Sequence, residues 1–260
     1  CLKSRGLGDV YKRQVFYRNQ QARYTVPMGE DEFAIAIENP DTALTVGKFR
    51  DECANPEGES CESTLGDEFQ KYNDLPDLTL RYRNNTDWGH FQFAGIARKL
   101  GYERVDTGQK DSEFGWGLNS STVINVTERD RLKLQLVYGE GIGNYMNDGG
   151  VDLAPAKATL ENNSAEAVPL LGIVAYYDHY WSDRWSTSVG WSSIKLDTTK
   201  GQAGNEFEEG QIAQVNLLHY PTDGVMLGGE LIWGERVDIS GDDGYDTRVQ
   251  FSLKVNVPKD

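Results

Sequence analysis

The last patterned segment of the chain alternates strictly between apolar and polar residues. From Val249 to Val257 the sequence reads VQFSLKVNV, so every second position is apolar and every intervening one is polar. A strand places successive side chains on opposite faces of a sheet, whereas a helix repeats its faces about every 3.6 residues. The pattern therefore predicts a β-strand with one apolar face and one polar face.

The same two-residue period recurs along most of the chain. It is clearest at residues 33–38, 78–83, 132–139, 185–192 and 225–233, and weaker strands fit at about 15–27, 88–104, 112–127, 167–181 and 209–220. No segment has a convincing helical period. We therefore expect about eleven strands of ten or more residues, close to the ~9–11 tilted residues that cross a bilayer and longer than the ~5–6 usual in soluble sheets.

The connections between these strands alternate in length. Short ones are predicted at 28–31, 85–87, 127–130, 182–184 and 221–224, and long ones at about 40–74, 105–111, 144–166, 198–208 and 239–244. Outer-membrane barrels have short periplasmic turns and longer extracellular loops. The predicted fold class is therefore all-β, an antiparallel up-and-down transmembrane β-barrel. Bacterial single-chain barrels have even strand numbers, so a count of about eleven suggests that the first strands are missing.

Composition is consistent with a barrel wall. The chain has 260 residues, 38% of them hydrophobic, and its mean hydropathy is −0.59. It has no run of the ~20 apolar residues that a membrane helix needs, but a barrel strand needs an apolar residue only at every second position. The formal net charge of −15 argues against a nucleic-acid partner, which would require a basic face.

Two short segments stand apart from this pattern. Residues 1–14, CLKSRGLGDVYKRQ, resemble a non-native leader, so we assign only residues 15–260 to a partial barrel. Cys53 and Cys61 lie in the acidic stretch DECANPEGESC. A disulfide between them across a polar loop would imply an oxidising compartment, and two free thiols are the alternative.

In a barrel the polar face of each strand lines the lumen, and here that face contains more bases than acids. Arg81 and Arg83 occupy two successive lumen positions with no acid between them. The other basic lumen residues are Arg23, Arg98, Lys133, Arg248 and Lys254. Arginine grips carboxylates through paired hydrogen bonds, and basic rings in pores select anions. An anion-attracting lumen is one interpretation, and pairing of these bases with lumen acids is the other.

The sequence supports neither a cofactor nor a catalytic site. The cysteines and histidines do not have the spacing of a structural zinc site. The chain has neither a G-x-S-x-G nor an H-E-x-x-H motif. We therefore expect no metal, no cofactor and no enzymatic activity.

Several short motifs occur in a recognisable order. They are WGHFQFAGIAR at 88–98, GWGLN at 115–119, YGEGIG at 138–143, NLLHYP at 216–221, WGER at 233–236 and RVQFS at 248–252. Together they resemble the DcaP-like family of outer-membrane porins, over about residues 15–257. Each motif alone is weak, and their order and spacing carry the resemblance.

The resemblance implies a sixteen-stranded barrel of which this chain supplies the last eleven strands. It also implies a homotrimer and passive diffusion of small anionic solutes such as dicarboxylates. The missing part would then hold a periplasmic extension, five strands and an inward-folded constriction loop. The chain is thus expected in the bacterial outer membrane, in contact with lipid and lipopolysaccharide.

The sequence leaves two other functions open. A secreted soluble β-sandwich could bind carbohydrate through exposed aromatic side chains, in which case Leu132, Leu134 and Leu136 would face a second sheet. An outer-membrane β-barrel enzyme would need a serine, a histidine and an acid that meet on the lumen wall. Coordinates distinguish these from a porin directly.

Overall fold

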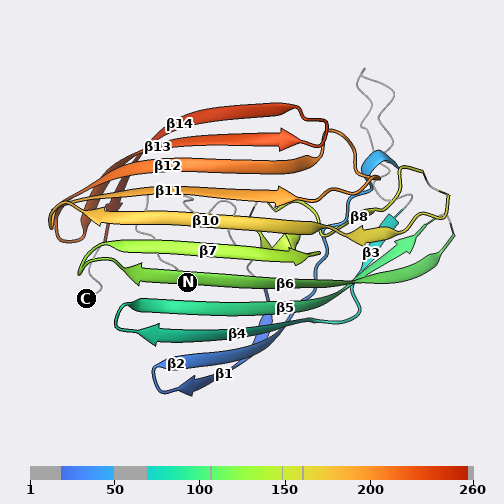
Figure 1. Cartoon of the computed structure of the whole chain (residues 1–260), viewed down its shortest axis with the longest axis horizontal. Coiled ribbons are helices and arrows are strands. Elements are labelled where there is room, and N and C mark those ends of the chain that lie inside the picture. Colours follow the sequence, from blue (N-terminus) through green and yellow to red (C-terminus); the bar gives the residue numbers. More distant parts are fainter. Residues whose placement is uncertain (1–18, 50–68, 106, 148, 160, 257–260) are drawn as a thin grey trace.

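The computed structural model describes residues 19–49, 69–105, 107–147, 149–159 and 161–256. Its main feature is one long, curved antiparallel sheet (Figure 1). Eleven strands follow one another across it in chain order, namely β1 (Gln21–Met28), β2 (Asp31–Glu38), β4 (Asp77–Thr86), β5 (Gly89–Arg104), β6 (Gln109–Asn125), β7 (Arg131–Glu140), β10 (Pro169–Tyr180), β11 (Trp185–Leu196), β12 (Phe207–Thr222), β13 (Val225–Asp238) and β14 (Asp243–Val255). The predicted all-β, up-and-down antiparallel architecture is confirmed.

The remaining elements are short. The strand β3 (Phe69–Tyr72) pairs with the outer end of β5, and β8 (Leu153–Pro155) pairs with β9 (Ala165–Ala167). Two 3-10 turns, η1 (Gly47–Phe49) and η2 (Gly143–Tyr145), are the helical elements of the described residues. No helix in these ranges is long and apolar enough to span a membrane. Within the described residues, β1 and β14 each pair on one side only, so the sheet is not closed.

The connection lengths follow the prediction with two exceptions. The short turns lie at one end of the strands, at the left in Figure 1, and β1–β2, β4–β5 and β12–β13 are separated by two residues each. At the other end, the β5–β6 and β13–β14 connections, predicted to be long, contain only four residues each. The reason is that these strands extend further than predicted, with pairs such as Glu103–Lys110 and Val237–Asp243 continuing the hairpins.

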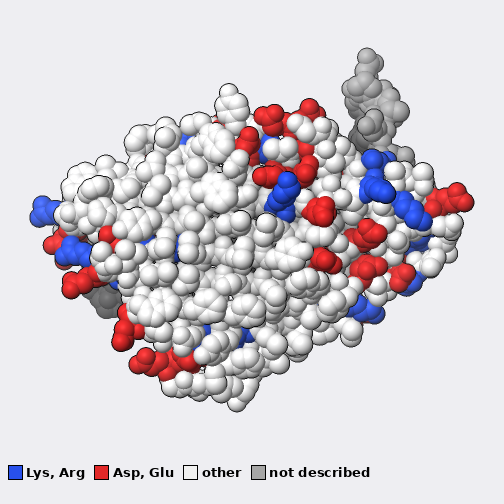
Figure 2. All heavy atoms as spheres, in the orientation of Figure 1, with Lys and Arg blue, Asp and Glu red and all other residues white. Residues whose placement is uncertain are grey.

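The two faces of the sheet have opposite chemistry, as β7 shows. Gln135 and Val137 are buried, whereas Leu134 and Leu136 are 37% and 50% exposed. We call the face of Val137 the inner face and that of Leu136 the outer face. Large apolar side chains are exposed on the outer face of most strands, including Ile35, Leu80, Phe93, Leu118, Val189, Leu217, Leu231 and Phe251. Figure 2 shows a largely uncharged area between charged side chains at the two ends of the strands.

This exposure decides against the soluble sandwich. That fold required Leu132, Leu134 and Leu136 to face a second sheet. Leu134 and Leu136 are instead exposed, and the described strands outside the β8–β9 pair all belong to one sheet. The prediction of an open apolar face is confirmed.

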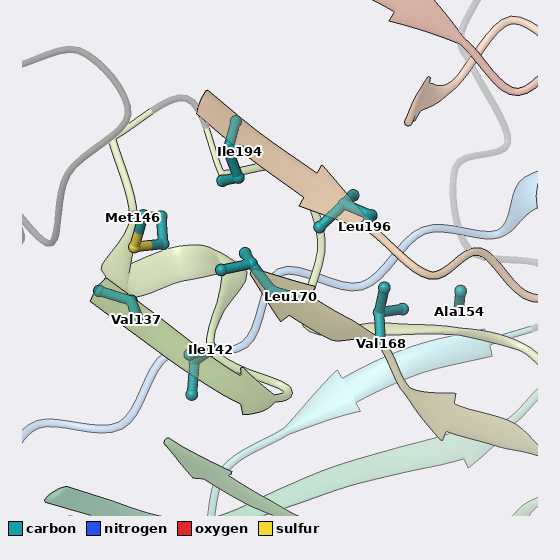
Figure 3. Close-up of a cluster of buried hydrophobic side chains, with 8 residues drawn as sticks. All are labelled: Val137, Ile142, Met146, Ala154, Val168, Leu170, Ile194 and Leu196. Atoms are coloured by element: carbon teal, nitrogen blue, oxygen red, sulfur yellow. The ribbon is translucent and has the colours of Figure 1, made fainter. Parts of the chain in front are cut away.

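Near the long connections, the inner face is covered by two segments of the chain itself. The first is residues 39–49 and the second is residues 141–156, apart from residue 148; we call them the first and second inner segments. Leu44 and Leu153 form a parallel bridge between them. A buried apolar cluster joins the second inner segment to β7, β10 and β11 (Figure 3), with the members Val137, Ile142, Met146, Ala154, Val168, Leu170, Ile194 and Leu196. The two larger buried clusters of the described residues therefore lie at one end of the inner face.

Candidate functional site on the inner face

A cavity of about 460 Å³ lies on the inner face. The strands β1, β2, β4, β5, β6 and β7 supply most of its lining, and the second inner segment contributes Ile142, Tyr145 and Met146. Three of the predicted basic residues, Arg23, Arg81 and Arg83, line it. We therefore take it as the candidate functional site.

The register of the strands arranges the inner-face residues in rows across the sheet. The first row, nearest the short turns, is Glu32, Arg83, Gln92, Ser121 and Gln135. The second row is Ala34, Arg81, Ala94, Asn119 and Val137. The third row is Ala36, Thr79, Ile96, Gly117 and Gly139. The cavity is therefore polar and basic at the end of the short turns, and small or apolar toward the inner segments.

A basic cluster occupies the polar end. Arg23 donates a hydrogen bond to Glu32 at 3.0 Å, and Arg81 forms an ion pair with the same carboxylate. Arg83 is the cross-strand partner of Glu32 and donates through Nε to Asn85 at 2.9 Å. Three guanidinium groups thus share this end of the cavity with one carboxylate. The ion-paired side chains are partly exposed, Arg81 by 23% and Glu32 by 36%.

Arg98 lies on the same face but in a different environment. It is 2% exposed, and its Nε donates to Asp77 at 2.9 Å. Its NH1 lies 3.2 Å from an oxygen of Asp152 and donates to the carbonyl of Gly141 at 2.6 Å. Its NH2 donates to the carbonyl of Asp41. One side chain on β5 therefore connects the start of β4 with both inner segments.

The partners of Arg98 are themselves fixed in place. The Asp152 carboxylate accepts backbone N–H bonds from Ala43 and Asn144, each at 2.9 Å. Burial raises the pKa of Asp152, although Arg98 and these N–H groups oppose the shift. Tyr145 donates its hydroxyl to Asp77 at 2.9 Å and lies under the Arg98 guanidinium, 5.0 Å from ring centroid to Cζ. Burial also raises the pKa of Tyr145. The network holds the second inner segment against the sheet.

The seven predicted pore residues therefore fall into distinct groups. Arg23, Arg81 and Arg83 come together at the cavity. Arg98 is buried among its partners, and Lys133 on the same face pairs with Asp178. Arg248 and Lys254 lie on the edge strand β14, exposed, opposite Ile232 and Met226 in register. The cavity thus collects three of the seven, all from β1 and β4.

Some functional residues were not found from the sequence. Asp77 directly precedes the strand predicted at 78–83, and no pattern in the sequence indicated its pairing with Arg98. Asp152 and Met146 lie in the long connection predicted at 144–166, and Ile142 lies just before it, where no periodicity gives a direction. Cys53, Cys61 and residues 1–14 lie outside the described residues, so the disulfide and the leader stay predictions.

The described residues do not assemble the triad that an enzyme would need. His179 is hydrogen-bonded to Asp130 through Nδ1 at 2.9 Å, and His219 contacts the carbonyl of Arg184. Neither these rings nor that of His90 forms a hydrogen bond with a serine hydroxyl. The same ranges contain no group of three His, Cys, Asp or Glu residues that could hold a metal ion.

Comparison with solved structures gives an informative similarity. No protein-family model and no curated protein matches the chain. Among solved structures, the outer membrane channel DcaP of Acinetobacter baumannii is similar with a TM-score of 0.71 at 17% identity, over 90% of this chain and 61% of that chain. The chain thus spans less than two thirds of the channel that it matches. The antiparallel up-and-down fold expected from the DcaP-like resemblance is confirmed, and the chain is similar in fold to part of an outer-membrane channel. The total of sixteen strands stays a prediction.

Proposed function

We propose that the chain forms part of the wall of a bacterial outer-membrane channel, through which small polar solutes, mainly anions, diffuse passively. The observation that carries this proposal is the exposed apolar outer face, which extends over strands from β2 to β14. Soluble proteins rarely expose contiguous apolar patches larger than a few hundred Å². Lipid is the medium in which such a face is stable, and the alternating polar face then lines water.

The chemistry of the inner face supports a preference for anions. The charged groups at the cavity are Arg23, Arg81 and Arg83 against Glu32 and Glu38, which leaves the bases in excess. Fixed positive charge attracts anions and repels cations within about a Debye length, ~8–10 Å at moderate salt. A wall with this charge raises the local anion concentration in the cavity.

The membrane orientation can be tested with two neighbouring cysteines. In a background with Cys1, Cys53 and Cys61 replaced by serine, Gln135→Cys should react with a charged, water-soluble thiol reagent in lipid vesicles. Leu136→Cys should be protected from that reagent and should react with a lipid-soluble one. Equal reaction of both positions with the water-soluble reagent would contradict the proposal.

Charge selectivity requires a separate measurement. The reversal potential across a planar bilayer under a salt gradient should show an anion preference, and the double variant Arg81→Ala/Arg83→Ala should weaken it. Lys195→Ala is the matched control, since Lys195 pairs with Glu209 outside the cavity. A cation preference that is the same in the wild type and the double variant would rule out the anion assignment.

The partners follow from the same proposal. Lipid and lipopolysaccharide would contact the outer face, and no cofactor is required. A homotrimer, which the family resemblance implies, stays a prediction that mass measurement in detergent can test.

A further inference from the structure

We propose that the outer face carries, at the turn between β10 and β11, a binding site for the headgroup of phosphatidylethanolamine, a phospholipid with a primary ammonium group. The site consists of Trp181, Trp185 and His219 with Arg184 of the turn, and we call it the turn-end site. This inference goes beyond the proposed channel, since it requires the outer face to contact lipid but does not require conduction. It is carried by the ring contacts, exposure and charge of these residues.

Strand register brings the two tryptophans and the histidine together. The pairing of β10 with β11 continues to the residues next to the turn, so Trp181 and Trp185 follow as the next opposed positions. Trp185 is the cross-strand partner of His219 on β12. Trp185 alternates in phase with the exposed Val189, and His219 with the exposed Leu217, so both lie on the outer face. Because opposed residues have Cβ atoms about 4.5–5.5 Å apart, the three side chains are neighbours.

The two indole rings are held in place and are still exposed. Trp185 stacks on His219, with ring centroids 4.2 Å apart. Trp181 lies perpendicular to His179 at 4.4 Å, and its indole N–H donates to the hydroxyl of Thr187 at 2.9 Å. Despite these contacts, Trp181 is 66% and Trp185 40% exposed. Tryptophan is enriched at the level of lipid headgroups, and the face of its ring attracts cations more strongly than other aromatic rings do.

The hydrogen bonding of His219 favours an ammonium that carries N–H groups. Its Nδ1 lies 3.2 Å from the carbonyl oxygen of Arg184. Since a carbonyl only accepts, Nδ1 carries the hydrogen, and Nε2 of the neutral ring is an acceptor. A primary ammonium over the Trp185 ring can donate to Nε2, whereas a trimethylammonium has no N–H to donate. The histidine therefore distinguishes an ethanolamine headgroup from a choline headgroup.

The turn adds a group for the phosphate. Arg184 is exposed, and its guanidinium has no ion-pair partner among the described residues. The preceding Asp183, in contrast, pairs with Arg129 of the β6–β7 turn at 2.6 Å. A guanidinium binds phosphate through paired hydrogen bonds. An accessible base beside two rings that attract cations complements a headgroup with one charge of each sign.

Native mass spectrometry of the detergent-solubilised protein tests this preference. The protein is stripped of lipid and mixed with equal amounts of phosphatidylethanolamine, phosphatidylcholine and phosphatidylglycerol that have the same acyl chains. We expect phosphatidylethanolamine to be retained about fivefold more than phosphatidylglycerol, which has no cationic group, and phosphatidylcholine to be intermediate. Equal retention of phosphatidylglycerol and phosphatidylethanolamine would overturn the inference.

Variants locate the effect. His219→Phe keeps a ring against Trp185 and removes the acceptor, so retention of phosphatidylethanolamine should fall to that of phosphatidylcholine. Arg184→Ala changes an exposed turn residue and should lower retention of all three lipids. Trp191→Leu is the matched control, since Trp191 is exposed on the same face of β11 farther from the turn, and it should leave the order unchanged. A preference that persists in both His219→Phe and Trp185→Leu would contradict the site.

This result is independent of the conductance measurements. If the reconstituted protein prefers phosphatidylethanolamine but conducts no ions, the proposed channel is wrong and the turn-end site stands. If it conducts ions but retains the three lipids equally, the turn-end site is wrong and the channel stands.

Discussion

The two ends of the inner face use the same residue type in opposite ways. Arg98, near the long connections, is buried and bonded to Asp77, Asp152 and two backbone carbonyls. Arg81 and Arg83, near the short turns, line an accessible cavity. All three side chains lie on the inner face of the sheet, and they are only a few rows apart.

The difference shows that burial, and not charge, decides what an inner-face arginine does. Where the inner segments exclude water, a guanidinium must be fully paired, because an unpaired buried charge is very costly. Where the face stays open, water compensates for incomplete pairing and the charge remains available to solutes. The anchored end therefore fixes the shape of the cavity, and the open end supplies its charge.

The largest expected effect comes from breaking the anchored end. Arg98→Met leaves the Asp77 and Asp152 carboxylates buried without their partner, which should lower the free energy of unfolding by about 3–5 kcal/mol. Release of the second inner segment should also increase single-channel conductance. Denaturant unfolding of the lipid-reconstituted protein, with conductance in planar bilayers, measures both.

The next residue in β5 offers the matched control. Lys99 pairs with Asp74 at 2.7 Å, but its side chain is 36% exposed. Lys99→Met should therefore change stability by no more than about 1 kcal/mol. If both variants unfold at the same denaturant concentration, the distinction between the two kinds of site is wrong.

A smaller effect is expected from crowding the contact between the sheet and the second inner segment. A methyl group at Gly139 would lie 2.2 Å from the Trp116 carbonyl oxygen and 3.0 Å from Ile142. Gly139→Ala should thus cost about 1–3 kcal/mol. Gly95→Ala is the comparison, since its nearest neighbour would be Leu118 at 3.6 Å. The same unfolding experiment compares them, and equal stabilities would contradict close packing at Gly139.

At the open end, loss of charge should affect selectivity more than stability. Arg81→Ala/Arg83→Ala removes accessible groups whose pairing is weak, so we expect a loss of about 1 kcal/mol or less. The reversal potential should nevertheless shift toward cations. A large loss of stability with unchanged selectivity would show that these arginines are structural in the same way as Arg98.

The smallest effect concerns the turn end of β7 and β10. The backbone N–H of Tyr180, His179 and the Tyr177 hydroxyl bond the Asp130 carboxylate and lower its pKa to about 2. Because the pKa of Asp130 is lower in the folded state, its carboxylate stabilises the fold at pH values above its unfolded-state pKa of about 3.9. This stabilisation is lost as the pH falls toward 2. The denaturant midpoints of wild type and Asp130→Asn should therefore converge between pH 5 and 2. A constant difference over that range would exclude this role for Asp130.

Several features of the fold could be predicted from the sequence because they depend on local periodicity. The alternation at 249–257 predicts which side chains of β14 share a face of the sheet. The alternation at 132–139 predicts that Leu136 and Val137 lie on opposite faces, and Leu136 is exposed while Val137 is buried. The resemblance in ordered motifs also indicated the correct fold. The inward direction of residues 141–156 could not be predicted, because a loop has no repeating pattern to show which side of a sheet it covers.

The sequence by itself thus determined the eleven strands of the main sheet, their order and which side chains share a face, since these follow from a two-residue period and short turns between neighbours. The short strands β3, β8 and β9, which fall in predicted loops, were not among them. Only the tertiary structure decided which inner-face charges stay open. Arg98 meets Asp152 across 54 positions of sequence, and that meeting depends on how two inner segments fold over one end of the sheet. Burial is a property of the assembled fold, and burial distinguishes an anchoring arginine from one that a solute can reach.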